Sequence, residues 1–218
     1  MTFHNVFPIF PLSISTFNYQ NHQKFKNRFF SYLEENKDKL TKTTYGFDLL
    51  HLHNVPDENF LDFHDDGGDF EKFLVESCNY YIKEIIGNKL EDVIVTDCWI
   101  NICGVSARQP FHNHGNSYIS GTYYLNYDPQ KHAHLKFNSP YQFGYHAAPF
   151  LTSDFEKITQ FNARDLDCSF IQEGQLVLWP SNLVHGYEEN DFENRITISM
   201  NFMPKRFSSG PYSFSILR

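Results

Sequence analysis

The sequence predicts a mainly β protein, built as a sandwich or jelly roll with α-helices packed on its outside. The chain holds 23 phenylalanines and 13 tyrosines, an aromatic share of 17%, and such side chains suit a pleated, half-buried surface. Helical periodicity near the N-terminus gives way, after Gly87, to short segments in which polar and apolar residues alternate. With 218 residues, the chain is long enough to bury a real core in one domain.

Two helices are expected before residue 90. In the first, from about 21 to 40, Phe25, Phe29 and Leu33 recur every four residues, with lysine and glutamate on the other side. In the second, Asp69 can cap the first turn and Gly87 supplies the stop. The apolar stripe of the second helix consists of Phe70, Phe73, Leu74, Ser77, Cys78, Tyr81, Ile82 and Ile85.

The rest of the chain is expected to form short strands separated by Pro, Gly and Asn. The opening FPIFPLSIS is typical of an edge strand or an extended lead-in, because proline cannot donate to a central ladder. Segment 141–166 is weakly periodic, which indicates a long loop over the mouth of the sandwich or an irregular excursion. The predicted strands are 93–102, 117–127, 134–138, 168–172, 175–180 and 195–204. We expect a single domain over 1–218, with one strand and helical support in 1–90, the β core in 91–204 and a tail in 205–218.

Composition argues against two classes of protein. A formal net charge of −8 and a pI near 5.7 disfavour a nucleic-acid binder that neutralises phosphates with a basic face. The N-terminus lacks a signal-peptide pattern, and no stretch approaches the ~20 apolar residues of a membrane span. We therefore expect a soluble, cytoplasmic protein with a small-molecule or protein substrate and no nucleic-acid or membrane partner. The four cysteines show no CxxC spacing and are expected to be buried free thiols.

Three His-x-His pairs are candidate metal ligands, since residues i and i+2 of a strand project to the same face. His51 and His53 precede Pro56 and are interpreted as a strand end with satisfied or solvent-facing rings. His132 and His134 lie in a turn entering a strand, where a solvated loop is expected. His64 belongs to an acidic loop, HDDGGD, which the capping role of Asp69 explains without a cation.

The pair His112 and His114 differs because of residues later in the chain. His185 follows the apolar run QLVLWP, and Arg195 then starts a strand in which Thr197 shares its face. A histidine can bind a metal while a planar guanidinium takes a carboxylate in a two-pronged contact. Together these residues predict a site for a metal and one small carboxylate.

The run HNHGNSYISGTYYLNY, the run GQLVLWPSNLVHG at 174–186 and the strand RITISMNF together resemble the Fe(II)/2-oxoglutarate-dependent oxygenases. More narrowly, they are similar to the group of these enzymes found in marine bacteria and their phages. The resemblance spans about 97–204 and rests on the order and spacing of several motifs. It implies a double-stranded β-helix with iron at the mouth of the barrel, and a location in the cytoplasm of the cell or of the phage host.

The resemblance also implies roles for single residues. His112 matches the first metal ligand and His185 the distal one. Arg195 matches the residue that grips the C5 carboxylate of 2-oxoglutarate, with Thr197 as its hydroxyl partner. Tyr124 is similar to a tyrosine that some members aim at this co-substrate.

His114 departs from the family pattern, which is His-x-Asp/Glu. One interpretation is a centre formed by His112, His114 and His185, all imidazoles, because a regular strand would point residues 112, 114 and 116 the same way. Alternatively, His114 is the first ligand, with Asn116 or no side chain at the other position. A third alternative is a degenerate member without catalysis. We favour the three-histidine set, with no catalytic side chain beyond the metal centre.

The resemblance therefore implies a dioxygenase that uses Fe(II), 2-oxoglutarate and O2 to hydroxylate an unidentified small-molecule or peptidyl substrate. Trp99, Asn101, Asn116 and Ser117 are expected on the substrate side, although core packing explains Trp99 equally well. Two alternatives stay open: a cupin-like metalloenzyme that does not use 2-oxoglutarate, and a non-catalytic jelly-roll module of a virion or carbohydrate-binding protein.

Overall fold

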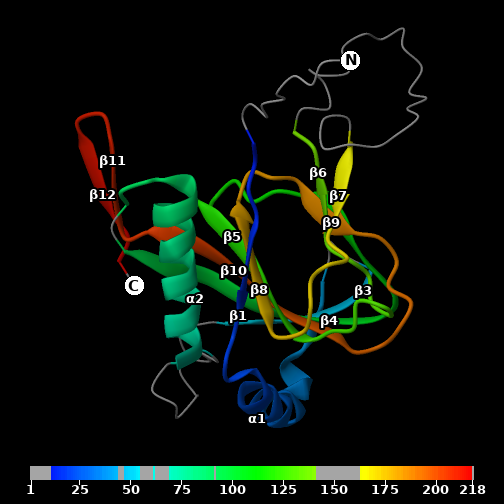
Figure 1. Cartoon of the computed structure of the whole chain (residues 1–218). Helices are drawn as coiled ribbons and strands as arrows, with labels where there is room; N and C mark the ends of the chain where they lie inside the picture. The colour runs from blue at the N-terminus through cyan, green and yellow to red at the C-terminus, as the bar shows by residue number, and fades with distance from the viewer. Residues whose placement is uncertain are drawn as a thin grey trace, which may run out of the picture.

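The computed structural model describes residues 11–43, 47–54, 61, 69–90, 92–140 and 163–217. Its strands form a curled antiparallel sheet in the order β1-β8-β5-β10-β4-β9-β6-β7, with β3 added to β4 and β2 to β3. The hairpin β11–β12 extends away from this body (Figure 1). The predicted class, mainly β with a jelly-roll core, is confirmed. The strands are β1 (Ser15–Asn18), β2 (Thr41–Lys42), β3 (Phe47–His53), β4 (Val93–His112), β5 (Ile119–Asn126), β6 (Lys136–Asn138), β7 (Asp165–Asp167), β8 (Gln175–Pro180), β9 (His185–Tyr187), β10 (Arg195–Pro204), β11 (Arg206–Ser209) and β12 (Tyr212–Ser215).

Both predicted helices form and lie outside the sheet (Figure 1). In α1 (His22–Glu35) the residues spaced four apart, Phe25, Phe29 and Leu33, are the buried ones. Helix α2 (Asp69–Tyr80) continues as a π-helical segment, Tyr81–Ile86, and stops at Gly87, whose φ of 77° suits glycine. A short 3-10 turn, Lys37–Lys39, follows α1. The main apolar core lies between these helices and one face of the sheet.

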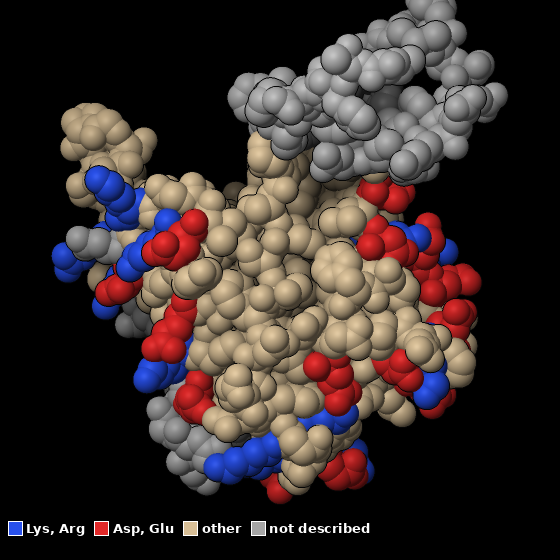
Figure 2. Space-filling view, in the orientation of Figure 1, with Lys and Arg blue, Asp and Glu red and all other residues tan. Residues whose placement is uncertain are grey.

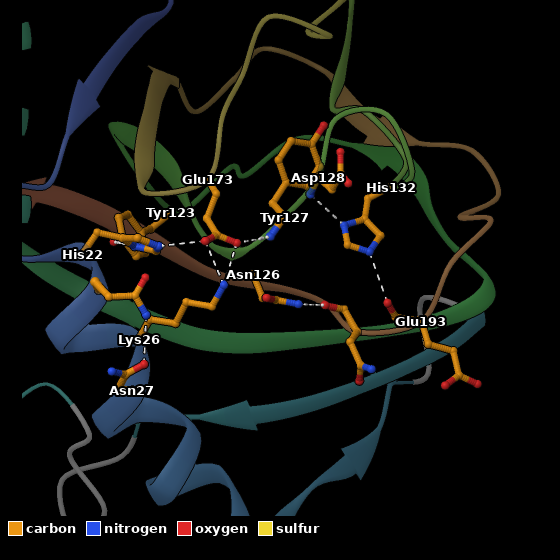
Figure 3. A network of polar contacts seen from close by, with 12 residues as sticks. His22, Lys26, Asn27, Tyr123, Asn126, Tyr127, Asp128, His132, Glu173 and Glu193 are labelled. Carbon is orange, nitrogen blue, oxygen red and sulfur yellow. Dashed lines mark hydrogen bonds and ion pairs between the residues drawn. The ribbon is translucent and has the colours of Figure 1, made fainter.

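A polar network fastens α1 to the sheet (Figure 3). Both carboxylate oxygens of Glu173 accept from Lys26 Nζ at 2.8 Å, and one also accepts from the backbone N–H of Tyr127 at 2.9 Å. The ring of His22 lies between this carboxylate, at 3.1 Å, and the hydroxyl of Tyr123, at 2.6 Å. The network therefore joins α1 to the turn before β8 and to β5.

Strand β4 bends and so belongs to both halves of the curled sheet. It pairs with β10 up to Cys103 and with β9 from Gln109 onward. Between these stretches Ser106 has a left-handed φ of 65°, and Asn190 holds the bend. The Asn190 amide donates to Gly104 O at 2.9 Å, while its backbone accepts from Ser106 N at 2.7 Å. The bend carries the end of β4 across to β9.

Several predicted boundaries were wrong. Segment 168–172 is a turn in which Cys168 and Ile171 are buried, and the strand lies just before it, at Asp165–Asp167. Strand 93–102 continues to His112, and the predicted tail contains the hairpin β11–β12. An edge strand does occur near the start of the chain, but it covers Ser15–Asn18 and shares only Ser15 with the predicted segment FPIFPLSIS. Residues 7–10 of the expected lead-in and 141–162 of the expected loop lie outside the described residues.

All four cysteines, Cys78, Cys98, Cys103 and Cys168, are free and buried, as predicted. Within the described residues, no helix is both long enough and apolar enough to cross a bilayer.

Candidate metal and co-substrate site

Three histidines meet where β4 and β9 come together. His112 ends β4 and lies opposite His185, the first residue of β9. His114 follows two residues later, and its backbone N–H donates to Ser181 O at 2.9 Å. The ring centroids are 4.5 Å apart for His112–His185, 5.1 Å for His112–His114 and 5.2 Å for His114–His185. One ring nitrogen from each histidine lies within 4.8 Å of the others.

The backbone from His112 to Asn116 does not follow the predicted regular strand. The strand ends at His112, so His114 and Asn116 are not on a continued strand face. The HNH segment instead leaves β4 and turns back over the end of β8, where Ser181 holds it. The condition of the prediction, a regular strand through residues 112, 114 and 116, is therefore not met, although the three histidines do come together and Asn116 lines the same cavity.

Gly186 allows β9 to approach β4 closely. A Cβ atom at this position would lie 2.8 Å from Gln109 O and 3.0 Å from the backbone of Phe111. Backbone atoms cannot move aside as a side chain can, so a larger residue would push β9 away. A larger residue at position 186 would therefore also move its neighbour His185, a candidate ligand, away from His112.

Two of the histidines have their tautomer set by the backbone. His112 Nδ1 is 2.8 Å from Pro110 O, and His185 Nδ1 is 2.9 Å from Leu183 O. A carbonyl only accepts, so each Nδ1 must carry the proton and each Nε2 keeps its lone pair in the neutral ring. This is the arrangement that orients a metal-binding imidazole.

Burial favours the neutral form of the His114 and His185 rings. Burial, with the neighbouring His112, lowers the pKa of His114 to about 4. Burial lowers the pKa of His185 to about 3, and His112 and His114 act in the same direction. Both rings are therefore neutral near pH 7, which is the form that binds a metal.

A cavity of about 840 Å³ connects the histidines to the inner face of the sheet. Nine of the ten residues predicted for the site line it, whereas Ser117 is not among them. The Ser117 hydroxyl donates to Ile119 O at 2.9 Å and accepts from Ser181 Oγ at 2.9 Å, so it serves the turn. The nine are His112, His114, His185, Arg195, Thr197, Tyr124, Trp99, Asn101 and Asn116.

Arg195 is a buried cation at the inner end of the cavity, only 2% exposed. Its Nε donates to Ala133 O at 3.0 Å, and the guanidinium lies 4.3 Å from the ring centroid of Tyr187. In the parts of the chain that the structure describes, Arg195 forms no ion pair with a carboxylate. A buried charge normally requires a partner, and an anion bound in the cavity would supply it.

Tyr124 and Thr197 lie beside this cation. The ring of Tyr124 is 5.6 Å from the guanidinium carbon, and its buried hydroxyl has no hydrogen-bond partner among the described residues. Burial raises the pKa of that hydroxyl, which therefore keeps its proton as a donor. Thr197 Oγ1 accepts from Asn101 Nδ2 at 3.4 Å, so its own proton is free to point into the cavity. The three side chains together offer donors for one carboxylate.

Sequence reasoning missed the outer lining of the cavity. His51, His53 and Asp97 all line it. His51 Nε2 is buried and without a partner among the described residues, so the interpretation of a satisfied or solvent-facing ring was wrong for His51. The signal was the alternation of LLHLH, which places both histidines on the face opposite Leu50 and Leu52.

The other candidate histidines lie elsewhere. His132 is buried, accepts from Asp128 N at 3.0 Å and contacts Glu193 O at 3.1 Å (Figure 3), so the expected solvated loop was wrong for it. His134 contacts Asp167 at 2.8 Å and Pro129 O at 2.7 Å. Both rings serve the turn that enters β6. His64 lies outside the described residues.

The donor set fits a divalent transition metal. Imidazole nitrogen suits iron, zinc, copper and nickel, and the open cavity leaves room for further ligands. No carboxylate joins the three rings within the described residues. The centre therefore differs by one negative charge from a site made of two histidines and one acid.

Residues 97–201 match the family described as "Putative 2OG-Fe(II) oxygenase". This stretch runs from near the start of β4 into β10 and contains His112, His114, His185 and Arg195. It confirms the resemblance to the Fe(II)/2-oxoglutarate-dependent oxygenases that the motifs indicated. No curated protein gives a significant sequence match.

Solved structures share the fold. A Pseudomonas putida prolyl-4-hydroxylase has a TM-score of 0.53 at 13% identity, over 88% of this chain and 92% of that one. SnoN, an α-ketoglutarate-dependent epimerase from nogalamycin biosynthesis, has a TM-score of 0.59 at 8% identity, over 92% and 80%. HygX from Streptomyces hygroscopicus, solved with nickel and 2-oxoglutarate bound, has a TM-score of 0.52 at 11% identity, over 90% and 85%. The chain thus has the fold of 2OG-Fe(II) oxygenases, a family of oxidoreductases whose name states its metal and co-substrate.

Proposed function

We propose that this chain, whose residues 97–201 match the 2OG-Fe(II) oxygenase family, hydroxylates a small-molecule or peptidyl substrate with a three-histidine iron centre. The observation that carries the proposal is the pairing of two features in one cavity: three converging imidazoles, and a buried arginine without an acidic partner among the described residues.

The metal would be held by His112, His114 and His185. Fe(II), when bound, supplies the open coordination positions at which 2-oxoglutarate and O2 react. The chain's own contribution is to present Nε2 of His112 and His185 as lone pairs, through the two backbone carbonyls that take their Nδ1 protons.

The co-substrate would lie between the metal and Arg195. The Arg195 guanidinium offers parallel N–H donors that match a carboxylate. The Tyr124 hydroxyl, unpaired in the described residues, and the Thr197 hydroxyl complete the set. These groups bind and orient the molecule, and their burial excludes water from its carboxylate end.

Hydroxylation is the most specific part of this proposal. The similar structures include a hydroxylase, an epimerase and a carbocyclase, so the fold is compatible with several outcomes at a substrate C–H bond.

Acidic side chains gather around β7 and β9, at the right edge of the view in Figure 2. They disfavour a polyanionic substrate such as nucleic acid.

The test is anaerobic titration of the purified protein with Mn(II), then with 2-oxoglutarate, followed by succinate formation with Fe(II) and O2. Arg195→Ala is expected to weaken 2-oxoglutarate binding by about 30-fold or more, since truncating one partner of a buried charge pair costs ~2–5 kcal/mol. Arg195→Lys keeps the charge and should retain part of the affinity.

Two results would contradict the proposal. If Arg195→Ala is folded and turnover is independent of 2-oxoglutarate, a cupin-like metalloenzyme replaces the oxygenase. If the protein binds neither Mn(II) nor Fe(II), a non-catalytic jelly-roll module becomes the better assignment.

A further inference from the structure

We propose that Trp99 is a positioning residue that holds His114 as the third metal ligand by stacking on its imidazole ring. The inference rests on the proposed metal site, and it explains how an imidazole is accommodated where the related oxygenases carry a carboxylate.

The three histidines are held in two different ways. His112 and His185 each have a ring nitrogen at hydrogen-bond distance from the backbone carbonyl two residues earlier. For His114 the only hydrogen bond found in the described part of the chain belongs to its backbone N–H, not to its ring. Among the described residues, no polar contact therefore orients the His114 ring.

Flat aromatic faces take the place of that contact. The ring of His114 lies nearly parallel to the indole of Trp99, with centroids 5.8 Å apart and an interplanar angle of 20°. Its other near-parallel neighbour is His185, at 5.2 Å and 11°. Both distances are in the range of offset stacking. His114 therefore has two near-parallel aromatic neighbours, whereas the ring of His112 is tilted by 45° to it.

Trp99 is itself well anchored. It lies in the middle of β4, opposite His53 of β3 and opposite Ser199 of β10. The ring of His53 stacks on Trp99 at 6.1 Å and 27°. His53 and His114 are therefore both near-parallel neighbours of the indole, which is half-buried and lines the cavity.

His114 needs such support because of its place in the chain. It lies beyond the last residue of β4 and is followed by Gly115, an exposed residue in a turn. A ring that must reach the metal from this segment loses rotamer freedom on binding unless it is already ordered. Stacking on a residue of a central strand orders it in advance.

The test measures Co(II) binding under anaerobic conditions and counts the coordinated imidazoles by X-ray absorption. We expect three imidazoles in the unsubstituted protein. Trp99→Leu, which removes the flat face, should bind Co(II) at least about 10-fold more weakly and with two imidazoles, in line with the effect of losing a group that orients a ligand. Trp99→Phe keeps a flat face and should retain three imidazoles.

Phe214→Leu is the matched control. It also removes an aromatic ring from a near-parallel pair, with Phe207 at 5.1 Å and 16°, but in the hairpin β11–β12, outside the lining of the cavity. Its Co(II) affinity should equal that of the unsubstituted protein. Far-UV circular dichroism and thermal unfolding establish that each variant is folded.

A measurement on the unsubstituted, metal-free protein avoids any effect of substitution on folding. The ring protons of His114 should show an upfield ring-current shift from Trp99 in the NMR spectrum. Ring protons at ordinary chemical shifts, or three imidazoles and unchanged affinity in folded Trp99→Leu, would overturn this inference alone. Absence of Co(II) binding by the unsubstituted protein would instead overturn the metal site of the proposed function as well.

Discussion

Tyr123 and Tyr124 are neighbours in β5 and both are completely buried, yet among the described residues only Tyr123 has a partner for its hydroxyl. Tyr123 faces the helices, where His22 lies 2.6 Å from its oxygen. Tyr124 faces the cavity, where its oxygen has no partner among the described residues. The same contrast holds for β10: Ile196, Ile198 and Met200 join the helix-side core, and Arg195 and Thr197 face the cavity.

The difference separates stability from function within single strands. On the helix side, apolar contacts and complete hydrogen bonds lower the free energy of the folded state. On the cavity side, buried polar groups without partners cost free energy until a ligand satisfies them. Substitutions on the helix side should therefore lower stability and leave ligand affinity unchanged. Substitutions on the cavity side should weaken ligand binding with little loss of stability.

The largest effect is expected at the metal centre. His185→Ala removes a ligand and should lower Mn(II) affinity by at least about 100-fold, because losing even a residue that only orients a ligand costs 10–100-fold. Isothermal titration in the absence of oxygen measures it. Phe29→Ala, on the helix side, should instead lower the free energy of unfolding by about 3–5 kcal/mol and leave the Mn(II) affinity of the folded protein unchanged. Equal metal affinity in His185→Ala and the unsubstituted protein would contradict the comparison.

A smaller effect is expected in the network that fastens α1. Glu173→Gln leaves Lys26 without its carboxylate and should lower the free energy of unfolding by about 1–3 kcal/mol, measured by urea denaturation. Glu188→Gln is the control, since Glu188 pairs with Lys136 at an exposed position and should matter by less than about 1 kcal/mol. A change in 2-oxoglutarate affinity in Glu173→Gln would show that the two sides are not independent.

The adjacent tyrosines allow the sharpest comparison. Tyr123→Phe removes a hydrogen-bonded hydroxyl and should cost about 1 kcal/mol of stability without changing 2-oxoglutarate affinity. Tyr124→Phe removes an unpaired hydroxyl, so it should leave stability unchanged or raise it, and weaken 2-oxoglutarate binding about 5-fold to 10-fold. If both variants lose stability equally, the Tyr124 hydroxyl has a partner that the proposal does not include.

The smallest effect is a pH dependence of the metal-free protein. Burial, and then His53, lowers the pKa of His51 from 6.5 to about 4. Between these values the unfolded chain binds protons that the folded chain does not, so stability should fall as the pH drops from about 6.5 towards 4. Urea denaturation at several pH values measures the slope, which should be less steep in His51→Leu. An identical slope in that variant would contradict the lowered pKa.

Local patterns in the sequence were enough to predict both helices, the strand at 195–204 and the ligand candidates, because period and motif order are local properties. The bend of β4 was not predictable in this way. It depends on Asn190, which lies far along the chain and holds Gly104 and Ser106. For the same reason the stacking of Trp99 on His114 was missed, since it arises only once β4 and the HNH segment are folded against each other.

The pairing of β4 with β9 brings His112 and His185 together from positions far apart in the chain. A metal ion bound by both would close the intervening residues into a loop, as a covalent cross-link does, and would reduce the freedom of the unfolded chain. The protein's thermal stability would then report the supply of metal, rising with its concentration even when no substrate is present.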